Sequence, residues 1–275
     1  MSTLFTGISE LRSVSERGTL NDAALVAESG TISWIGPASE APAADEKVDL
    51  GGRAVLPGWV DSHTHMVFDG DRSAEFEARI SGGSYEAGGI AVTMDATRQA
   101  GTDRLDKLVA DRVAAGRRGG TTTFETKTGY GLNTESEVEA AKVASRHVDD
   151  VTFLGAHLVP PGADAEDYLD EVVGPMLEGV APYVQWIDVF CERGAFNEEQ
   201  SRRVLEAGKK LGLGLRVHGN QLGEGPGVAL AVELGAASVD HVNHLSDEDV
   251  ELLANSDTVA TMLPACDLST REPAA

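Results

Sequence analysis

Two histidines separated by one residue, His63 and His65, stand shortly after the apolar run of residues 55–60. If that run is a buried strand, side chains two positions apart share a face, so the two imidazoles point the same way. Paired imidazoles are typical of sites that bind zinc or divalent iron. The pair alone is a weak signal, because two polar residues can follow a strand by chance. The rest of the chain has to decide between these interpretations.

Three more of the seven histidines also lie at or just after the ends of predicted strands: His157, His218 and His241. In a barrel of parallel strands, the carboxyl ends of all strands meet at one rim, where the active site lies. Five histidines converging there predict a shared site. We assign structural roles to the remaining two, His147 in a predicted helix and His244 in a loop.

These residue types fit hydrolysis assisted by a metal ion. Three imidazoles and one carboxylate would leave one position open for a water, and a divalent cation lowers the pKa of such a water towards neutrality. A further histidine outside the metal's ligands can polarise the carbonyl under attack. Residues 125–131 offer a phenol, Tyr130, on a flexible turn. Arg72 lies on the loop just past the histidine pair and would suit a carboxylate, although the sequence alone favours an ordinary surface ion pair.

The elements that must position these residues alternate between strand and helix. Strands are predicted at residues 55–60, 121–125, 151–155, 184–190, 213–217, 238–242 and 258–263, and helices at residues 102–119, 165–177, 197–211 and 228–234. Two further helices are expected to begin at a capping box over residues 134–137 and at a Ser246 cap. Residues 66–101 are expected to form a long irregular loop.

Seven strands alternating with helices predict an α/β fold with a parallel sheet. The count is one unit short of an eight-stranded TIM-type (β/α) barrel, so we expect an incomplete barrel over residues 55–275. A doubly wound open sheet is the alternative, but no glycine-rich phosphate turn follows the first strand. Residues 1–54 contain four short β-type runs, at 4–8, 24–27, 31–35 and 47–50. We expect these to form the N-terminal half of a small β-sandwich-like domain.

Composition narrows the class of partner. The net charge of −23 over 275 residues argues against nucleic acid and anionic membranes. No apolar run is long enough to span a membrane, and no signal peptide is evident. The two cysteines, Cys191 and Cys266, lie far apart and suggest a reducing compartment. We expect a cytoplasmic enzyme. The expectation of a small anionic substrate comes from Arg72 and not from the composition, and a homodimer is compatible with the sequence.

Several motifs resemble known families. Residues 31–36 (TISWIG) and 56–65 (LPGWVDSHTH) resemble the amidohydrolase superfamily. A narrower resemblance, to the imidazolonepropionase family, spans nearly the whole chain. It rests on residues 67–72, 80–85, 127–132, 155–157 and 263–267. It implies an enzyme of histidine degradation that opens the ring of 4-imidazolone-5-propanoate to give N-formimidoyl-L-glutamate.

The resemblance also implies roles for individual residues. The run at residues 188–192 contains no lysine, which argues against two metals bridged by a modified lysine and for a single ion. His241 is implied to assist at the carbonyl. The implied ligands of one zinc or iron ion are His63, His65 and His218, and the implied substrate-binding residues are Arg72, Tyr85, Tyr130, His157 and Gln221.

Two features depart from the family pattern. Gln221 stands where members often carry a glutamate, and an amide cannot take a proton. Members also continue beyond residue 275, with an eighth strand that carries a metal-binding aspartate, and Asp267 does not match that position. We therefore expect little turnover from residues 1–275 alone. Two alternatives remain open: another cyclic amidohydrolase or heterocycle aminohydrolase, and an inactive truncated member.

Overall fold

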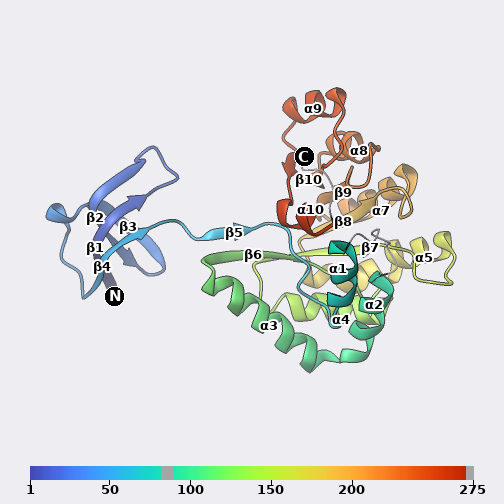
Figure 1. The fold of residues 1–275 in the computed structure, drawn as a ribbon, viewed down its shortest axis with the longest axis horizontal. Coiled ribbons are helices and arrows are strands. Elements are labelled where there is room, and N and C mark those ends of the chain that lie inside the picture. The colour runs from blue at the N-terminus through green and yellow to red at the C-terminus, as the bar shows by residue number, and fades with distance from the viewer. Residues whose placement is uncertain (82–88, 271–275) are drawn as a thin grey trace. The chain divides into compact units, whose positions relative to one another are not determined.

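The computed structural model describes residues 1–81 and 89–270. The chain forms two compact units, Met1–Trp59 and Val60–Ala275, whereas the sequence predicted a boundary after residue 54. Figure 1 shows both units, and each is described by itself.

The smaller unit is a four-stranded sheet. Its strands are β1 (Ser2–Arg12), β2 (Thr19–Glu28), β3 (Thr31–Pro37) and β4 (Glu46–Val55), in the order β3-β2-β1-β4. β1 pairs antiparallel with β2 and parallel with β4. All four predicted β-type runs lie in these strands. Its two apolar clusters are small, one around Leu4 and Val26 and the other around Ile8 and Leu11.

The larger unit contains a seven-stranded parallel sheet in which spatial order equals chain order. Because the order never reverses, the doubly wound alternative is wrong, and the sheet is an incomplete TIM-type barrel. Its strands are β5 (Trp59–Asp61), β6 (Thr121–Lys127), β7 (Asp150–Ala156), β8 (Trp186–Cys191), β9 (Gly214–Gly219), β10 (Ser238–His241) and β11 (Val259–Thr261).

Helices follow the strands as a barrel requires. They share one apolar core with the sheet, in which Val109, Leu169 and Leu205 from helices are buried with Ile187 of β8. The helices between strands are α3 (Thr102–Arg118), α4 (Thr134–Ala144), α5 (Ala165–Glu171), α6 (Leu177–Val180), α7 (Glu198–Lys210), α8 (Gly227–Leu234) and α9 (Asp247–Ala254). A π-type turn, η2 (Val172–Met176), joins α5 to α6 and contains Pro175, which explains why one predicted helix is broken there.

The prediction of an irregular loop over residues 66–101 is wrong. α1 (Ser73–Ile80) and α2 (Gly89–Ala100) lie in it. The buried residues of α2 include Thr93 and Thr97, so its inward face carries little of the apolar periodicity that reveals a helix. A last helix, α10 (Pro264–Thr270), was not predicted either.

The prediction of one buried strand over residues 55–60 is also wrong. Val55 ends β4 of the smaller unit, and β5 contains only three residues. Trp59 and Val60 are 63% and 66% exposed, because β5 stands at an edge of its sheet and pairs on one side only. The strand still ends two residues before His63, so the inference about the histidine pair survives.

The capping box predicted over residues 134–137 does not form. The N-cap of α4 is Asn133, whose side chain accepts a hydrogen bond from the backbone of Ser136. Glu137 turns inward instead and is fully buried. The caps predicted at Asn197 and Ser246 are both present as capping boxes.

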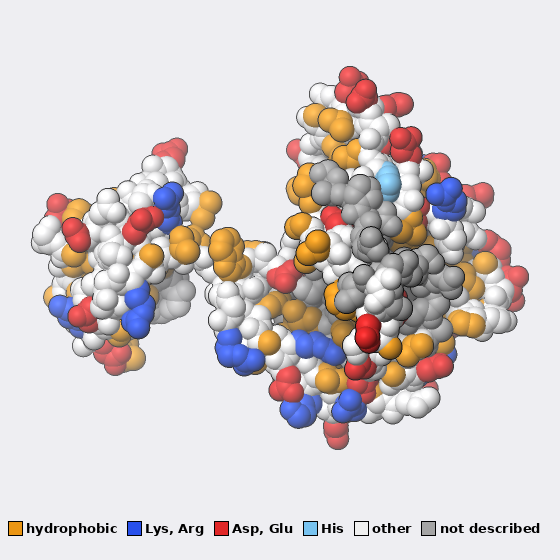
Figure 2. Space-filling view, in the orientation of Figure 1, with side chains coloured by type: hydrophobic (Ala, Val, Ile, Leu, Met, Phe, Trp, Pro, Cys, Tyr) orange, Lys and Arg blue, Asp and Glu red, His pale blue; other side chains and the backbone are white. Residues whose placement is uncertain are grey.

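Acidic side chains are scattered widely over the visible surface of the larger unit, and basic ones gather along the edge formed by α3 (Figure 2). Within residues 1–81 and 89–270, no helix is long and apolar enough to cross a membrane.

Candidate metal and substrate site

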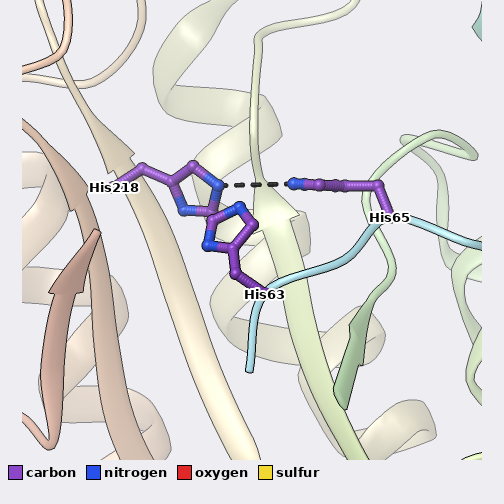
Figure 3. A group of neighbouring side chains, drawn as sticks. All are labelled: His63, His65 and His218. Carbon is purple, nitrogen blue, oxygen red and sulfur yellow. Dashed lines mark hydrogen bonds between the residues drawn. The ribbon is translucent and has the colours of Figure 1, made fainter. Parts of the chain in front are cut away.

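Three histidines converge at the carboxyl ends of the strands. His63 and His65 follow β5, and His218 lies in β9. One ring nitrogen from each lies within 4.8 Å of the other two, and the Nε2 atoms of His65 and His218 are 3.4 Å apart. Figure 3 shows the three rings pointing into one space from two segments far apart in the sequence.

The contacts of two of these rings with carboxylates fit a divalent cation. His63 Nδ1 is 2.7 Å from Asp240 Oδ2, and His218 Nδ1 is 2.9 Å from Asp188 Oδ2. A carboxylate acceptor keeps the proton on Nδ1, so that Nε2 has a lone pair available to a metal. This arrangement is common among metal-binding histidines. Burial lowers the pKa of His63 to about 4, so the ring is neutral near pH 7. Neutral imidazoles with converging lone pairs suit zinc and divalent iron.

Charged side chains buried under the histidines were missed by the sequence analysis. The Lys127 ammonium lies 3.0 Å from Asp188 Oδ2, 3.5 Å from Asp240 Oδ2 and 3.1 Å from Glu125 Oε1. Lys127, Asp188 and Asp240 are fully buried. A signal existed, because charged residues within apolar strands are rarely buried unless they are paired.

The electrostatics of this cluster favour its charged form. Burial by itself raises the pKa of Asp240, but the hydrogen bond from His63 and the charge of Lys127 hold that pKa below the ordinary range. Burial likewise lowers the pKa of Lys127, but Asp188, Glu125 and Asp240 together raise it above the usual value. Lys127 is therefore an ammonium ion.

A cavity of about 640 Å³ opens over the three histidines. It is large enough for a small ligand. Of the residues implied by the resemblance, Tyr85 lies outside the described residues, and all the others line the cavity: His63, His65, Arg72, Tyr130, His157, His218, Gln221 and His241.

Two aromatic rings form one wall of the cavity. The His157 ring stacks on that of His65, with centroids 5.6 Å apart, and the Tyr130 ring meets both edge-on. His157 Nδ1 lies 2.9 Å from the carbonyl oxygen of Gly129 and donates to it. Burial lowers the pKa of His157 to about 4, so its Nε2 is a neutral acceptor. This wall can accept a hydrogen bond from a ligand N–H.

The turn that carries Tyr130 is not flexible, contrary to the prediction. The buried Glu137 carboxylate accepts hydrogen bonds from the backbone N–H groups of Gly129, Gly131 and Leu132. From the other side, Arg98 of α2 donates to the carbonyl oxygens of Gly131 and Leu132. Side chains from two helices therefore fix the turn.

Arg72 binds a carboxylate within this chain. Its Nε lies 2.8 Å from Glu75 Oε2, and its Nη2 lies 2.7 Å from Glu75 Oε1. This is the parallel two-bond geometry by which guanidinium recognises carboxylates. Both side chains are about one-quarter exposed. Arg72 therefore forms the ion pair that was the alternative interpretation, and it also lines the cavity.

His241 ends β10 in a strained conformation. Its φ is 80°, and that of Val242 is 50°, which is unfavourable for side chains with a Cβ. The ring centroid lies 5.4 Å from that of His63 and 5.2 Å from that of His218. Burial lowers the pKa of His241, so the ring is neutral. This backbone conformation places the His241 ring beside the three converging histidines.

Comparison with known proteins decides the family. No family model matches the chain. The whole chain is 64% identical to an imidazolonepropionase of Arthrobacter sp. and 62% identical to one of Micrococcus luteus, covering 72% and 73% of their lengths. It is 54% identical to an imidazolonepropionase of Streptomyces coelicolor over 98% of the chain and 70% of the relative. The chain belongs to the imidazolonepropionase family.

Solved structures agree at the level of the fold. A triazine hydrolase superposes with a TM-score of 0.69 at 16% identity, covering 98% of this chain and 66% of its own. A guanine deaminase of C. acetobutylicum gives 0.67 at 12% identity, covering 99% and 70%. With the imidazolonepropionase relatives, these matches place the chain among the hydrolases of the amidohydrolase fold.

The remaining two histidines do not line the cavity. His147 was predicted in a helix but lies in the turn after α4, which ends at Ala144, and His244 lies in a loop as predicted. His147 Nε2 pairs with Asp106 Oδ1 at 3.0 Å, and the backbone N–H of His244 donates to the carbonyl oxygen of Asn220. Asp267 is buried in α10 and does not line the cavity either.

Proposed function

We propose that this protein hydrolyses the ring of 4-imidazolone-5-propanoate to give N-formimidoyl-L-glutamate. The observation that carries the proposal is the cavity, which combines three converging imidazoles with a guanidinium that already binds a carboxylate. The substrate has the two matching parts, a cyclic amide and a propanoate chain. The membership of the imidazolonepropionase family supports the same reaction.

We propose His63, His65 and His218 as ligands of one divalent ion, zinc or iron. When bound, such an ion would acidify a water and polarise the ring carbonyl. The chain's contribution is to present three neutral imidazoles, two of them oriented by Asp240 and Asp188.

The other lining residues would bind and orient the substrate. Arg72 would hold the propanoate, which must displace Glu75 from the guanidinium. His157 would accept a hydrogen bond from a ring N–H at its Nε2, and Tyr130 would close the same wall. Neutral His241 would donate a ring N–H to the substrate carbonyl oxygen. Gln221 can form a hydrogen bond but cannot take a proton.

The test follows the loss of the imidazolone chromophore. Residues 1–275 are extended with the C-terminal part of the Arthrobacter relative, because the resemblance implies an aspartate ligand there. We expect metal-dependent ring opening that is lost in His63→Ala/His65→Ala, and no turnover of hydantoin or guanine. Preference for another heterocycle, or no turnover with metal bound, would overturn the proposal.

A further inference from the structure

A second group of candidate ligand atoms shares His218 with the three histidines. Atoms of Asp188, His218 and Asp240 lie within 4.8 Å of one another, and all three residues are buried. The Lys127 ammonium approaches both carboxylates, at 3.0 Å from Asp188 Oδ2 and 3.5 Å from Asp240 Oδ2. The cation that pairs with the carboxylates of this second group is therefore the Lys127 ammonium.

The barrel brings these charges together. Lys127 lies in β6, Asp188 in β8 and Asp240 in β10, which are alternate strands of the sheet. Alternate strands of such a barrel contribute inward side chains to the same layer. Lys127, Asp188 and Asp240 thus form one charged layer, and the imidazole rings separate this layer from the ligand nitrogens. Each of the two carboxylates faces both Lys127 and a histidine.

We propose that Lys127 is a positioning residue of the metal site. Its ammonium holds Asp188 and Asp240 in place, and the two carboxylates keep His218 and His63 with Nδ1 protonated and Nε2 facing the ion. One lysine thereby orients two ligands that lie more than 150 residues apart in the chain. The inference rests on the proposed metal site and adds a residue that makes no contact with the metal.

A merely structural role for Lys127 would be to offset buried negative charge. Such a role predicts a loss of stability when Lys127 is replaced, without a change in which imidazole nitrogen carries the proton. The positioning role predicts a change in the tautomers of His63 and His218, measurable without any metal or turnover. Metal affinity should change with them, because groups that orient metal ligands typically contribute about 10–100-fold.

The experiment uses the full chain, labelled with ¹⁵N at histidine and studied by NMR without metal, followed by zinc titration. In the wild type, we expect both His63 and His218 to carry the proton on Nδ1. In Lys127→Met, which keeps the length of the side chain but not its charge, we expect at least one of them to lose that tautomer. We expect zinc affinity to fall by about 10–100-fold.

The matched control is Thr152→Val. Thr152 donates to Glu125 Oε1 at 2.5 Å, so the substitution disturbs the same buried network without touching Asp188 or Asp240. We expect wild-type tautomers and zinc affinity in this variant. Unchanged tautomers and affinity in Lys127→Met would overturn the proposal.

Two provisions keep the test decisive. If Lys127→Met does not fold, Lys127→Gln is measured in the same way. Whatever the variants do, a proton on Nε2 of either His63 or His218 in the metal-free wild type would overturn the inference. A wild type that binds no zinc would instead refute the proposed metal site, and the tautomers would still report on Lys127.

Discussion

Arg72 is the residue at which substrate recognition can be tested most simply. A lysine ammonium cannot reproduce the two parallel hydrogen bonds of a guanidinium. We expect Arg72→Lys to weaken substrate binding by about 1.5–3 kcal/mol, the range for a lost charge-assisted contact, which raises KM by about 10- to 150-fold. Steady-state kinetics of the extended protein measure this change. Unchanged KM and kcat would show that Arg72 only forms a surface ion pair.

Replacing Glu75 should change KM in the direction opposite to Arg72→Lys. Its carboxylate occupies the guanidinium that the propanoate needs, so the two compete. We expect Glu75→Gln to lower KM, because a neutral amide is the weaker competitor. Glu77→Gln is the control, since Glu77 is an exposed residue of the same helix. A rise in KM for Glu75→Gln alone would mean that Glu75 supports Arg72 instead of competing for it.

The sequence predicted the histidines of the site better than the groups that orient them. His157 and His218 were found because chemistry in a barrel lies at the carboxyl ends of the strands. Asp188 and Asp240 were missed because which strand residues face one another depends on the relative register of strands far apart in the chain. That register follows from tertiary packing, which a local pattern does not specify.

At the scale of the elements, Glu137 links α4 to the turn that carries Tyr130. A glutamine offers one acceptor oxygen in place of two, so Glu137→Gln must lose part of its bonding to three backbone N–H groups. We expect a loss of about 1–3 kcal/mol in the free energy of unfolding, measured by urea denaturation. We also expect a higher KM.

Glu135→Gln provides the comparison on the same helix, because Glu135 is exposed. We expect its stability and KM to match the wild type. Equal stability of the two variants would show that the buried carboxylate does not hold the turn.

The elements themselves were predictable to the extent that their signals are local. Seven strands followed from β-branched runs between glycines and helix caps, and the caps at Asn197 and Ser246 are local hydrogen bonds. α2 was missed because it buries threonines, and β5 was overextended because the apolar run 55–60 is shared between two sheets. The apolar character of a run does not indicate which sheet its residues join.

At the scale of the molecule, both edge strands of the seven-stranded sheet expose apolar side chains. Val60 of β5 is 66% exposed, and Val259 of β11 is 61% exposed. Open strand edges with apolar side chains favour association between copies. We expect residues 1–275 expressed alone to self-associate, and Val259→Lys to reduce this in sedimentation velocity.

Val14→Lys is the matched control, because Val14 is 90% exposed and lies in the smaller unit. Equal effects of the two substitutions would mean that general solubility, and not the sheet edge, governs association.

The turnover rate should also differ between residues 1–275 alone and the extended protein. The resemblance implies a proton-accepting aspartate beyond residue 275, and general acid–base assistance is typically worth about 10²–10⁴-fold. We expect residues 1–275 alone to open the imidazolone ring slower than the extended protein by that factor. Comparable rates would mean that another carboxylate takes the role, and Asp267→Asn would then test the candidate in α10.

The most direct test of the account is the metal content of the purified protein. Zinc or iron is measured by elemental analysis after reconstitution and dialysis, in the wild type, in His63→Ala/His65→Ala and in His147→Ala, whose histidine pairs with Asp106 and does not line the cavity. We predict one equivalent of metal per chain in the wild type and in His147→Ala, and its loss in the double variant. Full occupancy in the double variant would contradict the assignment of His63, His65 and His218 as the metal site.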